Sequence, residues 1–76
     1  MYIEKINRLA SEIEGIMEEI KTNKKEIKKR ENILAIQIDN DLEVEIIEYK
    51  EEIKNLRQRL IMKKQLLKNY KKLWNN

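Results

Sequence analysis

The chain has 76 residues with a net charge of +3, and charged and hydrophobic residues each make up 41% of it. It contains no cysteine and no histidine. Disulfides and thiolate metal sites are therefore excluded, and the commonest transition-metal ligand and general base are missing. A chain this short buries little apolar surface on its own, so we expect it to associate with another chain.

The composition predicts an all-α fold, because proline is absent and Gly15 is the one glycine. No apolar run approaches the roughly 20 residues that cross a bilayer. Residues 1–10 alternate charged and apolar side chains, unlike a signal peptide. We therefore expect a cytoplasmic protein without a membrane span. The excess of lysine and isoleucine suits an AT-rich genome, such as that of a low-GC bacterium or its phage.

A first helix is predicted over about residues 2–36, because its apolar residues recur at alternating steps of three and four. Such spacing is typical of a coiled-coil seam. Asn23 and Arg30 interrupt the series. Its apolar members are Tyr2, Ile6, Leu9, Ile13, Ile16, Ile20, Ile27 and Leu34.

A turn is predicted over about residues 37–41, within the only cluster of short polar residues. Asn40 followed by Glu43 fits a helix N-cap with its reciprocal acid, and Asp41 adds negative charge to the first turn. The apolar series on either side of this cluster are out of phase, which also favours a break here.

A second helix is predicted over about residues 41–74, with its own series at steps of three and four. Lys63 interrupts this series. Its members are Leu42, Ile46, Tyr49, Ile53, Leu56, Leu60, Lys63, Leu67, Tyr70 and Trp74. Residues 1–76 are therefore interpreted as a single antiparallel two-helix coiled-coil hairpin that associates into a four-helix bundle.

Charge supports the antiparallel arrangement. Residues 1–20 carry two bases and five acids, and residues 56–76 carry seven bases and no acid. Residues 21–38 carry six bases and two acids, and residues 39–55 carry two bases and seven acids. Folding the chain about Ile38 places an acidic quarter opposite a basic quarter twice, although Lys24 falls near Lys50. The same fold brings Tyr2 to Trp74. Two long helices paired antiparallel as a domain-swapped dimer satisfy the same pattern.

The polar seam residues Asn23, Arg30 and Lys63 can fix the register, and the two cations can bury their stems while their charges reach solvent. Near the open end, the apolar stripe is wider than one partner helix covers. This surplus predicts either a homodimeric four-helix bundle or a groove for a foreign helix. Its residues are Ile3, Ala10, Met17, Ile61, Met62, Leu66 and Leu73.

The hairpin tip has a second surplus of apolar side chains, which either cap the core or form a docking patch. Its residues are Ile36, Ile38, Val44 and Ile47, within a ring of Asp39, Asp41, Glu43 and Glu45. The alternating acids resemble a calcium loop, but Val44 and Lys50 occupy the positions where that loop needs glycine and a bidentate acid. Capping explains these acids better.

Residues 56–76 form a basic amphipathic segment that predicts an alternative, nucleic-acid binding. The candidate residues are Arg57, Lys64, Lys68, Lys71 and Lys72. Against this reading, Tyr70 and Trp74 occupy seam positions rather than base-stacking ones. The basic run over residues 21–30 is interpreted as a solvated helix face.

Catalysis has little support. Ser11 and Thr22 have no histidine or cysteine to activate them. The adjacent glutamates of the pairs Glu18–Glu19 and Glu51–Glu52 point in different directions from the helix surface. We expect no enzyme, no cofactor and no metal. The sequence predicts a non-enzymatic protein-binding module, such as a small regulator, adaptor or inhibitor, that forms a homodimer and binds a protein of unknown identity. A nucleic-acid-associated protein and a structural assembly protein are the alternatives.

Overall fold

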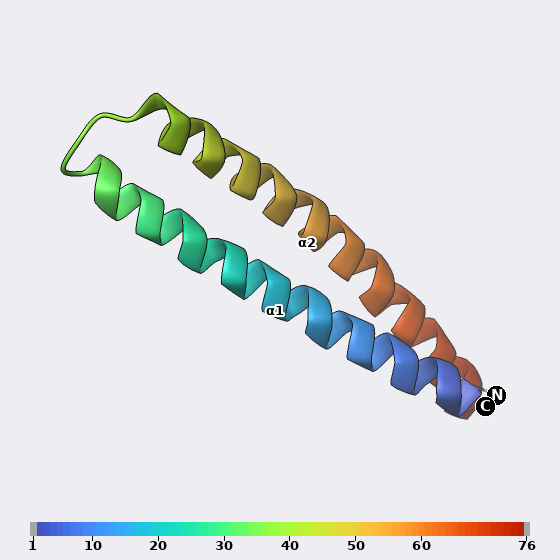
Figure 1. Cartoon of the computed structure of the whole chain (residues 1–76). Helices are drawn as coiled ribbons and strands as arrows, with labels where there is room; N and C mark the ends of the chain where they lie inside the picture. Colours follow the sequence, from blue (N-terminus) through green and yellow to red (C-terminus); the bar gives the residue numbers. More distant parts are fainter. Residues whose placement is uncertain (1, 76) are drawn as a thin grey trace.

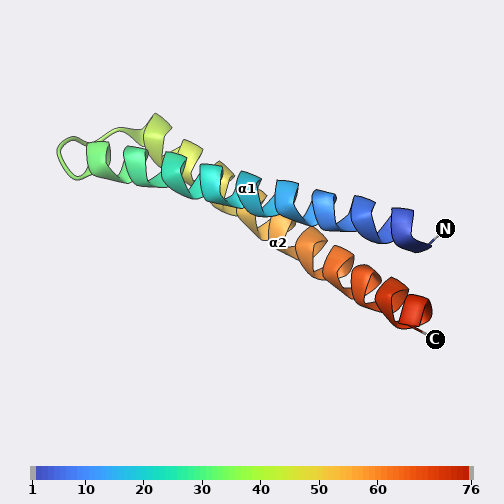
Figure 2. The same cartoon turned by 90° about the horizontal axis from the view of Figure 1, so that it is seen from below.

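The computed structural model describes residues 2–75 and consists of two helices packed antiparallel, α1 (Tyr2–Leu34) and α2 (Asn40–Asn75). The molecule is a rod whose Cα atoms extend over 58 × 14 × 13 Å. The connection between the helices lies at one end, and the two chain ends lie together at the other (Figure 1). Seen from below, the helices cross at mid-length and diverge toward the chain ends (Figure 2). The chain is therefore a folded-back hairpin, not one continuous helix.

The core is a single seam between the helices. The buried residues of α1 follow the predicted steps of four and three, and Asn23 is among them. The buried residues of α2 are Ile46, Ile53 and Leu56. Leu56 is the most buried apolar side chain, with 3% exposed, and no described side chain is less than 2% exposed. Two helices have a contact line and no interior, so every other residue lies on a flank or points outward.

The register across the seam is close to the predicted one. Arg30 Nε lies 2.8 Å from a carboxylate oxygen of Glu45. Lys63 Nζ lies 2.7 Å from a carboxylate oxygen of Glu12. These pairs join the basic and acidic quarters in the two predicted combinations.

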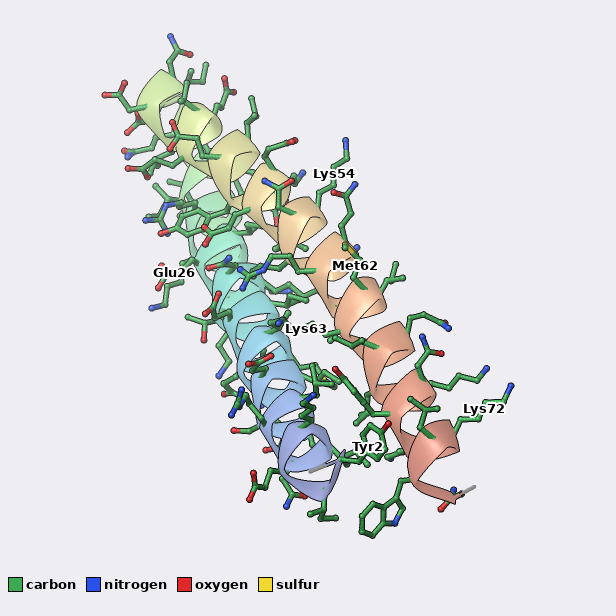
Figure 3. The ribbon with its side chains drawn as sticks, turned by 90° about the vertical axis from the view of Figure 1, so that its right-hand side faces the viewer. Tyr2, Glu26, Lys54, Met62, Lys63 and Lys72 are labelled. Atoms are coloured by element: carbon green, nitrogen blue, oxygen red, sulfur yellow. The ribbon has the colours of Figure 1, made fainter. Side chains whose placement is uncertain are left out.

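The pairing predicted at the open end is wrong. Tyr2 packs against Tyr70, with ring centroids 6.0 Å apart and planes tilted by 45°. Tyr2 lies between the two diverging helix ends (Figure 3). Trp74, the expected neighbour, is 50% exposed. Trp74 lies in the last turn of α2, one turn beyond Tyr70.

Helix α1 ends at Leu34, two residues before the predicted end. The amide of Ile36 donates to the carbonyl oxygen of Ile33 at 3.0 Å, and the amide of Gln37 donates to the same oxygen at 3.1 Å. Bonds that span three residues tighten the last turn and satisfy carbonyl groups at a helix end. The chain leaves the helix without a glycine or any positive φ angle in the described residues.

The predicted N-cap of the second helix was one residue late. Asp39 Oδ1 accepts hydrogen bonds from the amides of Asp41 at 3.0 Å and Leu42 at 3.3 Å. The amide of Glu43 donates to the carbonyl oxygen of Asp39 at 3.2 Å. Asp39 is therefore the cap, and Asn40 is the first residue of α2. The Asx cap satisfies two amides that would otherwise lack partners at the start of the helix.

Replacing the cap tests this assignment. Asp39→Ala removes both side-chain hydrogen bonds and should lower the free energy of unfolding by about 1 kcal/mol. Asn40→Ala leaves the cap intact and is the matched control, with an expected change within about 0.5 kcal/mol. Urea unfolding followed by circular dichroism measures both. A larger loss for Asn40→Ala than for Asp39→Ala would restore the predicted cap.

Candidate functional site

Two flanks run along the rod, one on each side of the seam, and their charges differ. Lys24 and Glu26 are two residues apart on α1, so they point about 200° apart around the helix axis. Lys50 and Glu52 stand in the same relation on α2. In Figure 3, Glu26 extends from α1 on one side of the hairpin, and Lys54 extends from α2 on the other.

The flank that carries Glu26 and Glu52 we call the carboxylate flank. One of its hollows is lined by Gly15, Glu18, Glu19, Thr22, Asn23 and Glu52. A second is lined by Arg30, Glu45, Glu48, Tyr49 and Glu52. The ion pairs of the described residues all gather on this flank, and its acids are partly neutralised as a result.

Arg30 is the centre of the ion pairs near the tip. Its Nη1 lies 2.7 Å from a Glu26 carboxylate oxygen, and its Nε contacts Glu45. The guanidinium also lies over the Tyr49 ring, 4.7 Å from the centroid. The hydrogen bond with Glu45 raises the pKa of Arg30, and the hydrogen bond from Arg30 lowers the pKa of Glu26. Arg30 and Lys63 were predicted to lift their charges to solvent, but each instead bridges the two helices.

Lys63 forms the corresponding bridge near the open end. In Figure 3 it extends from α2 toward α1, whereas Lys54 and Lys72 extend away from α1. The hydrogen bond from Lys63 lowers the pKa of Glu12 below its ordinary value of 4.5.

The Glu12–Lys63 bridge predicts a pH dependence. A carboxylate with a lowered folded pKa stabilises the fold above its ordinary pKa, and this contribution is lost as the pH falls through the folded value. Wild type should therefore be more stable than Glu12→Gln at pH 7, and the two stability curves should converge as the pH falls through the folded pKa of Glu12. Urea unfolding at each pH measures this. Glu14→Gln is the control, at an exposed position without an ion pair in residues 2–75. The free energy of unfolding of this variant should stay close to that of wild type at every pH.

Asn23 is the polar residue of the seam, and only 9% of it is exposed. Its Nδ2 has no hydrogen-bond partner among the described residues. A buried donor without a partner costs about 1–3 kcal/mol. Because Asn23 costs stability, we interpret it as a residue that specifies the register in which the two helices pair.

Asn23→Leu should raise the free energy of unfolding by about 1–2 kcal/mol, because it replaces an unpaired buried amide with apolar surface. Asn32→Leu, at an exposed position of the same helix, is the control and should change it by less than about 0.5 kcal/mol. Chemical unfolding compares the two variants. A destabilised Asn23→Leu chain would mean that the amide has a partner in solution.

The opposite flank carries lysine and arginine side chains, and six of them form what we call the cationic band. Lys24, Lys50, Lys54 and Arg57 line one hollow with Ile27, Ile53 and Gln58, and no acid lines it. Lys21 and Lys28 line a second hollow with Lys24, Lys25 and Lys29, of which Lys29 is paired with Glu26. The band consists of Lys21, Lys24, Lys28, Lys50, Lys54 and Arg57. No ion pair joins any of the six to an acid within the described part of the chain.

The sequence reasoning missed most of this band. Arg57 was a candidate for binding nucleic acid, and Lys21–Lys28 were discounted. The proximity of Lys24 to Lys50 was noted only as a mismatch. Of the other predicted nucleic-acid contacts, Lys64 and Lys71 follow Arg57 at seven-residue steps, and Lys68 lies one turn from both on the helix surface. Lys72 points outward, and Asn76, the end of the predicted segment, lies outside the described residues.

The predicted apolar stripe at the open end is exposed but divided between the two flanks. Leu66 shares a hollow with Lys5, Arg8 and Glu12 of α1. Ile3 precedes Lys5 by two positions, and Ala10 precedes Glu12 by two positions. Both therefore lie on the opposite flank of the seam. By the same periodicity Met17 and Ile61 fall with Ile3, and Met62 and Leu73 fall with Leu66. The seven residues therefore do not form one continuous surface.

The tip residues include the two most exposed large hydrophobic side chains of the described residues. Ile38 is 92% exposed, Ile36 88%, Ile47 65% and Val44 53%. They do not close the end of the core, which was one of the two predicted roles. Asp39 is occupied by its capping bonds, and Glu45 by Arg30.

Neither helix within residues 2–75 is long and apolar enough to cross a membrane. The described residues also contain no cluster of three or more acids arranged to hold a metal ion. None of the family models, curated proteins or solved structures compared with this chain matches it.

Proposed function

We propose that this chain is a non-enzymatic protein-binding module, a small regulator, adaptor or inhibitor that works by presenting exposed aliphatic surface to other helices. One observation carries the proposal. The described residues expose thirteen large hydrophobic side chains and bury eight. Exposed apolar surface on this scale marks a protein interaction site.

The helices are proposed to form an antiparallel coiled coil that associates into a four-helix bundle. A third or fourth helix covers flank residues that a two-helix seam leaves open. The absence of buried side chains below 2% exposure among the described residues supports this proposal, because a second hairpin would cover the seam on the flank that it packs against.

The open end offers the surface for a foreign partner. Leu66 and Leu73 are 44% and 50% exposed. Leu66 lies beside Lys5 and Arg8 in one hollow. An amphipathic helix with an apolar stripe and an acidic rim fits this combination of aliphatic and basic side chains.

Photo-crosslinking in the cells that encode the protein tests the proposed partner surface. A photoreactive side chain at position 66 should give a covalent adduct with one discrete protein of a different mass. The same side chain at position 51, which points outward on α2, is the control and should give none. Leu66→Asp with Leu73→Asp should abolish co-purification of that protein while leaving the helical content unchanged. Adducts only with nucleic acid, or none at all, would overturn the proposal.

A nucleic-acid-binding function is the second candidate, and the cationic band is the observation that favours it. The band and the lysines that follow it present cations at regular intervals along one flank, as phosphate binding requires. The aromatic residues give less support, because Tyr70 is half-buried against Tyr2 and is not free to stack on a base. Retention of duplex DNA at physiological salt distinguishes this candidate.

A further inference from the structure

No acid lines the hollow between the helices in the cationic band, and the acids of the same flank follow it toward the tip. On α1, Lys24 is seven residues before Glu31, and on α2, Glu43 is seven residues before Lys50. A seven-residue step returns to the same side of a helix, so each of these pairs lies on one flank. All four side chains are exposed and lack an ion pair within the described residues. Each helix therefore carries one unpaired cation and one unpaired anion about 10 Å apart along its axis.

Such an arrangement is self-complementary about a two-fold axis. Consider a second copy that lies antiparallel on this flank, so that the two α1 helices face each other. If the two-fold axis passes between residues 27 and 28, Lys24 meets Glu31 of the second copy. With α2 facing α2, Lys50 meets Glu43 of the second copy when the axis passes between residues 46 and 47. A two-fold contact repeats each pairing with the roles exchanged.

The axis position that α1 requires and the one that α2 requires agree to within one residue. The Arg30–Glu45 bridge places those residues at the same level of the rod. Residues 27–28 of α1 then lie at the level of residues 47–48 of α2, because the helices run in opposite directions. This is within one residue, or about 1.5 Å, of the position that α2 requires. One axis therefore satisfies both helices.

We propose that the hairpin forms a two-fold symmetric dimer in which the tip halves of two copies overlap, with the acids of each tip on the cationic band of the other copy. This inference rests on the proposed association through helix surfaces and specifies its geometry. Four helices lie side by side over the overlap. The contacts are Lys24 with Glu31 and Lys50 with Glu43, each made twice.

The same overlap covers exposed apolar surface. Ile47, which is 65% exposed, lies next to the axis and meets its own copy. By the same symmetry Lys28 meets Lys28 of the second copy, and the flexible stems must carry these like charges apart into solvent beside the interface.

The size of the overlap predicts a weak dimer. About 20 residues of each helix take part, which gives a contact about 30 Å long and two helices wide, or roughly 1,200 Å² in total over both copies. This is the lower end of the range for specific interfaces. We expect a dissociation constant in the micromolar range that rises with ionic strength, because much of the attraction is between exposed charges.

The observations favour a second copy over nucleic acid as the occupant of the band. Aliphatic rather than aromatic side chains accompany the cations, since Ile27 and Ile53 line the band's hollow and Met17 and Ile47 flank it. Aliphatic side chains fit a helix surface and offer no base-stacking platform. Phosphate binding also gives no role to the acids at seven-residue spacing.

Charge exchange tests the dimer. Variant A carries Lys24→Glu and Lys50→Glu, and variant B carries Glu31→Lys and Glu43→Lys. Each variant alone places like charges at all four contacts, so its dimer dissociation constant should rise at least about tenfold over wild type. A mixture of A and B restores every opposite pair and should form a heterodimer. Sedimentation equilibrium from about 1 µM to 1 mM measures all three, with circular dichroism to verify that each variant is folded.

Two matched controls locate the interface. Lys64→Glu with Lys71→Glu changes the same charge on the same flank outside the overlap and should dimerise like wild type. Ile47→Cys should oxidise to a covalent dimer, since the wild-type sequence contains no cysteine. Ile61→Cys, at an equally exposed position on the same flank (68% against 65%), lies outside the overlap and should not.

The failure of this proposal is distinguishable from that of the proposed function. A wild-type chain that stays monomeric to 1 mM, or a mixture of A and B that does not pair, overturns the dimer and leaves the crosslinking test at position 66 unaffected. A third outcome is a monomeric wild-type chain that binds a 20-base-pair duplex at 150 mM salt, together with a variant A that does not bind it. In that case the band binds nucleic acid, and the dimer is likewise overturned.

Discussion

The contact between α1 and α2 is a single line of aliphatic side chains, and every other feature is placed by it. Burying one such side chain contributes about 1.5–3 kcal/mol at most, and the described residues bury eight. Because two cylinders meet along a line, a residue either faces the seam, borders it on one of two flanks, or points away. The register of the seam thus determines which charges share a flank, and from that follow the carboxylate flank and the cationic band.

We interpret the polar residues of the seam as acting on register rather than on strength. Arg30 and Lys63 each reach a glutamate of the other helix, at 2.8 and 2.7 Å. A slip by one heptad in one direction would set Lys63 against Lys5 in place of Glu12, whereas a slip in the other direction would exchange Glu45 and Glu12 for Glu52 and Glu19. The bridges are half-buried and still in contact with water, which limits their contribution to stability. Asn23 lowers stability through its unpaired amide, and a chain that retains such a residue gives up stability for a defined alignment.

The sequence was sufficient to predict two packed helices, because steps of three and four identify the residues that face the seam. It could not choose between Asp39 and Asn40 as the cap, since both side chains accept amide hydrogen bonds and the two are adjacent. The open-end stripe was predicted as one surface because each helix was read separately. In an antiparallel pair, residues after a seam position on α1, such as Ala10, and residues before one on α2, such as Leu66, fall on opposite flanks. Once the antiparallel direction is accepted, this rule identifies the two flanks and the band.

The place of Trp74 has an optical consequence. It is the only tryptophan of the sequence, it lies at the open end far from the connection, and half of its surface is in water. Indole emission depends on the polarity around the ring. A molecule that covers the open end would shift that emission to shorter wavelength, and a contact confined to the tip would leave the spectrum unaltered. The chain thus contains an intrinsic fluorophore that reports on one end of the rod alone.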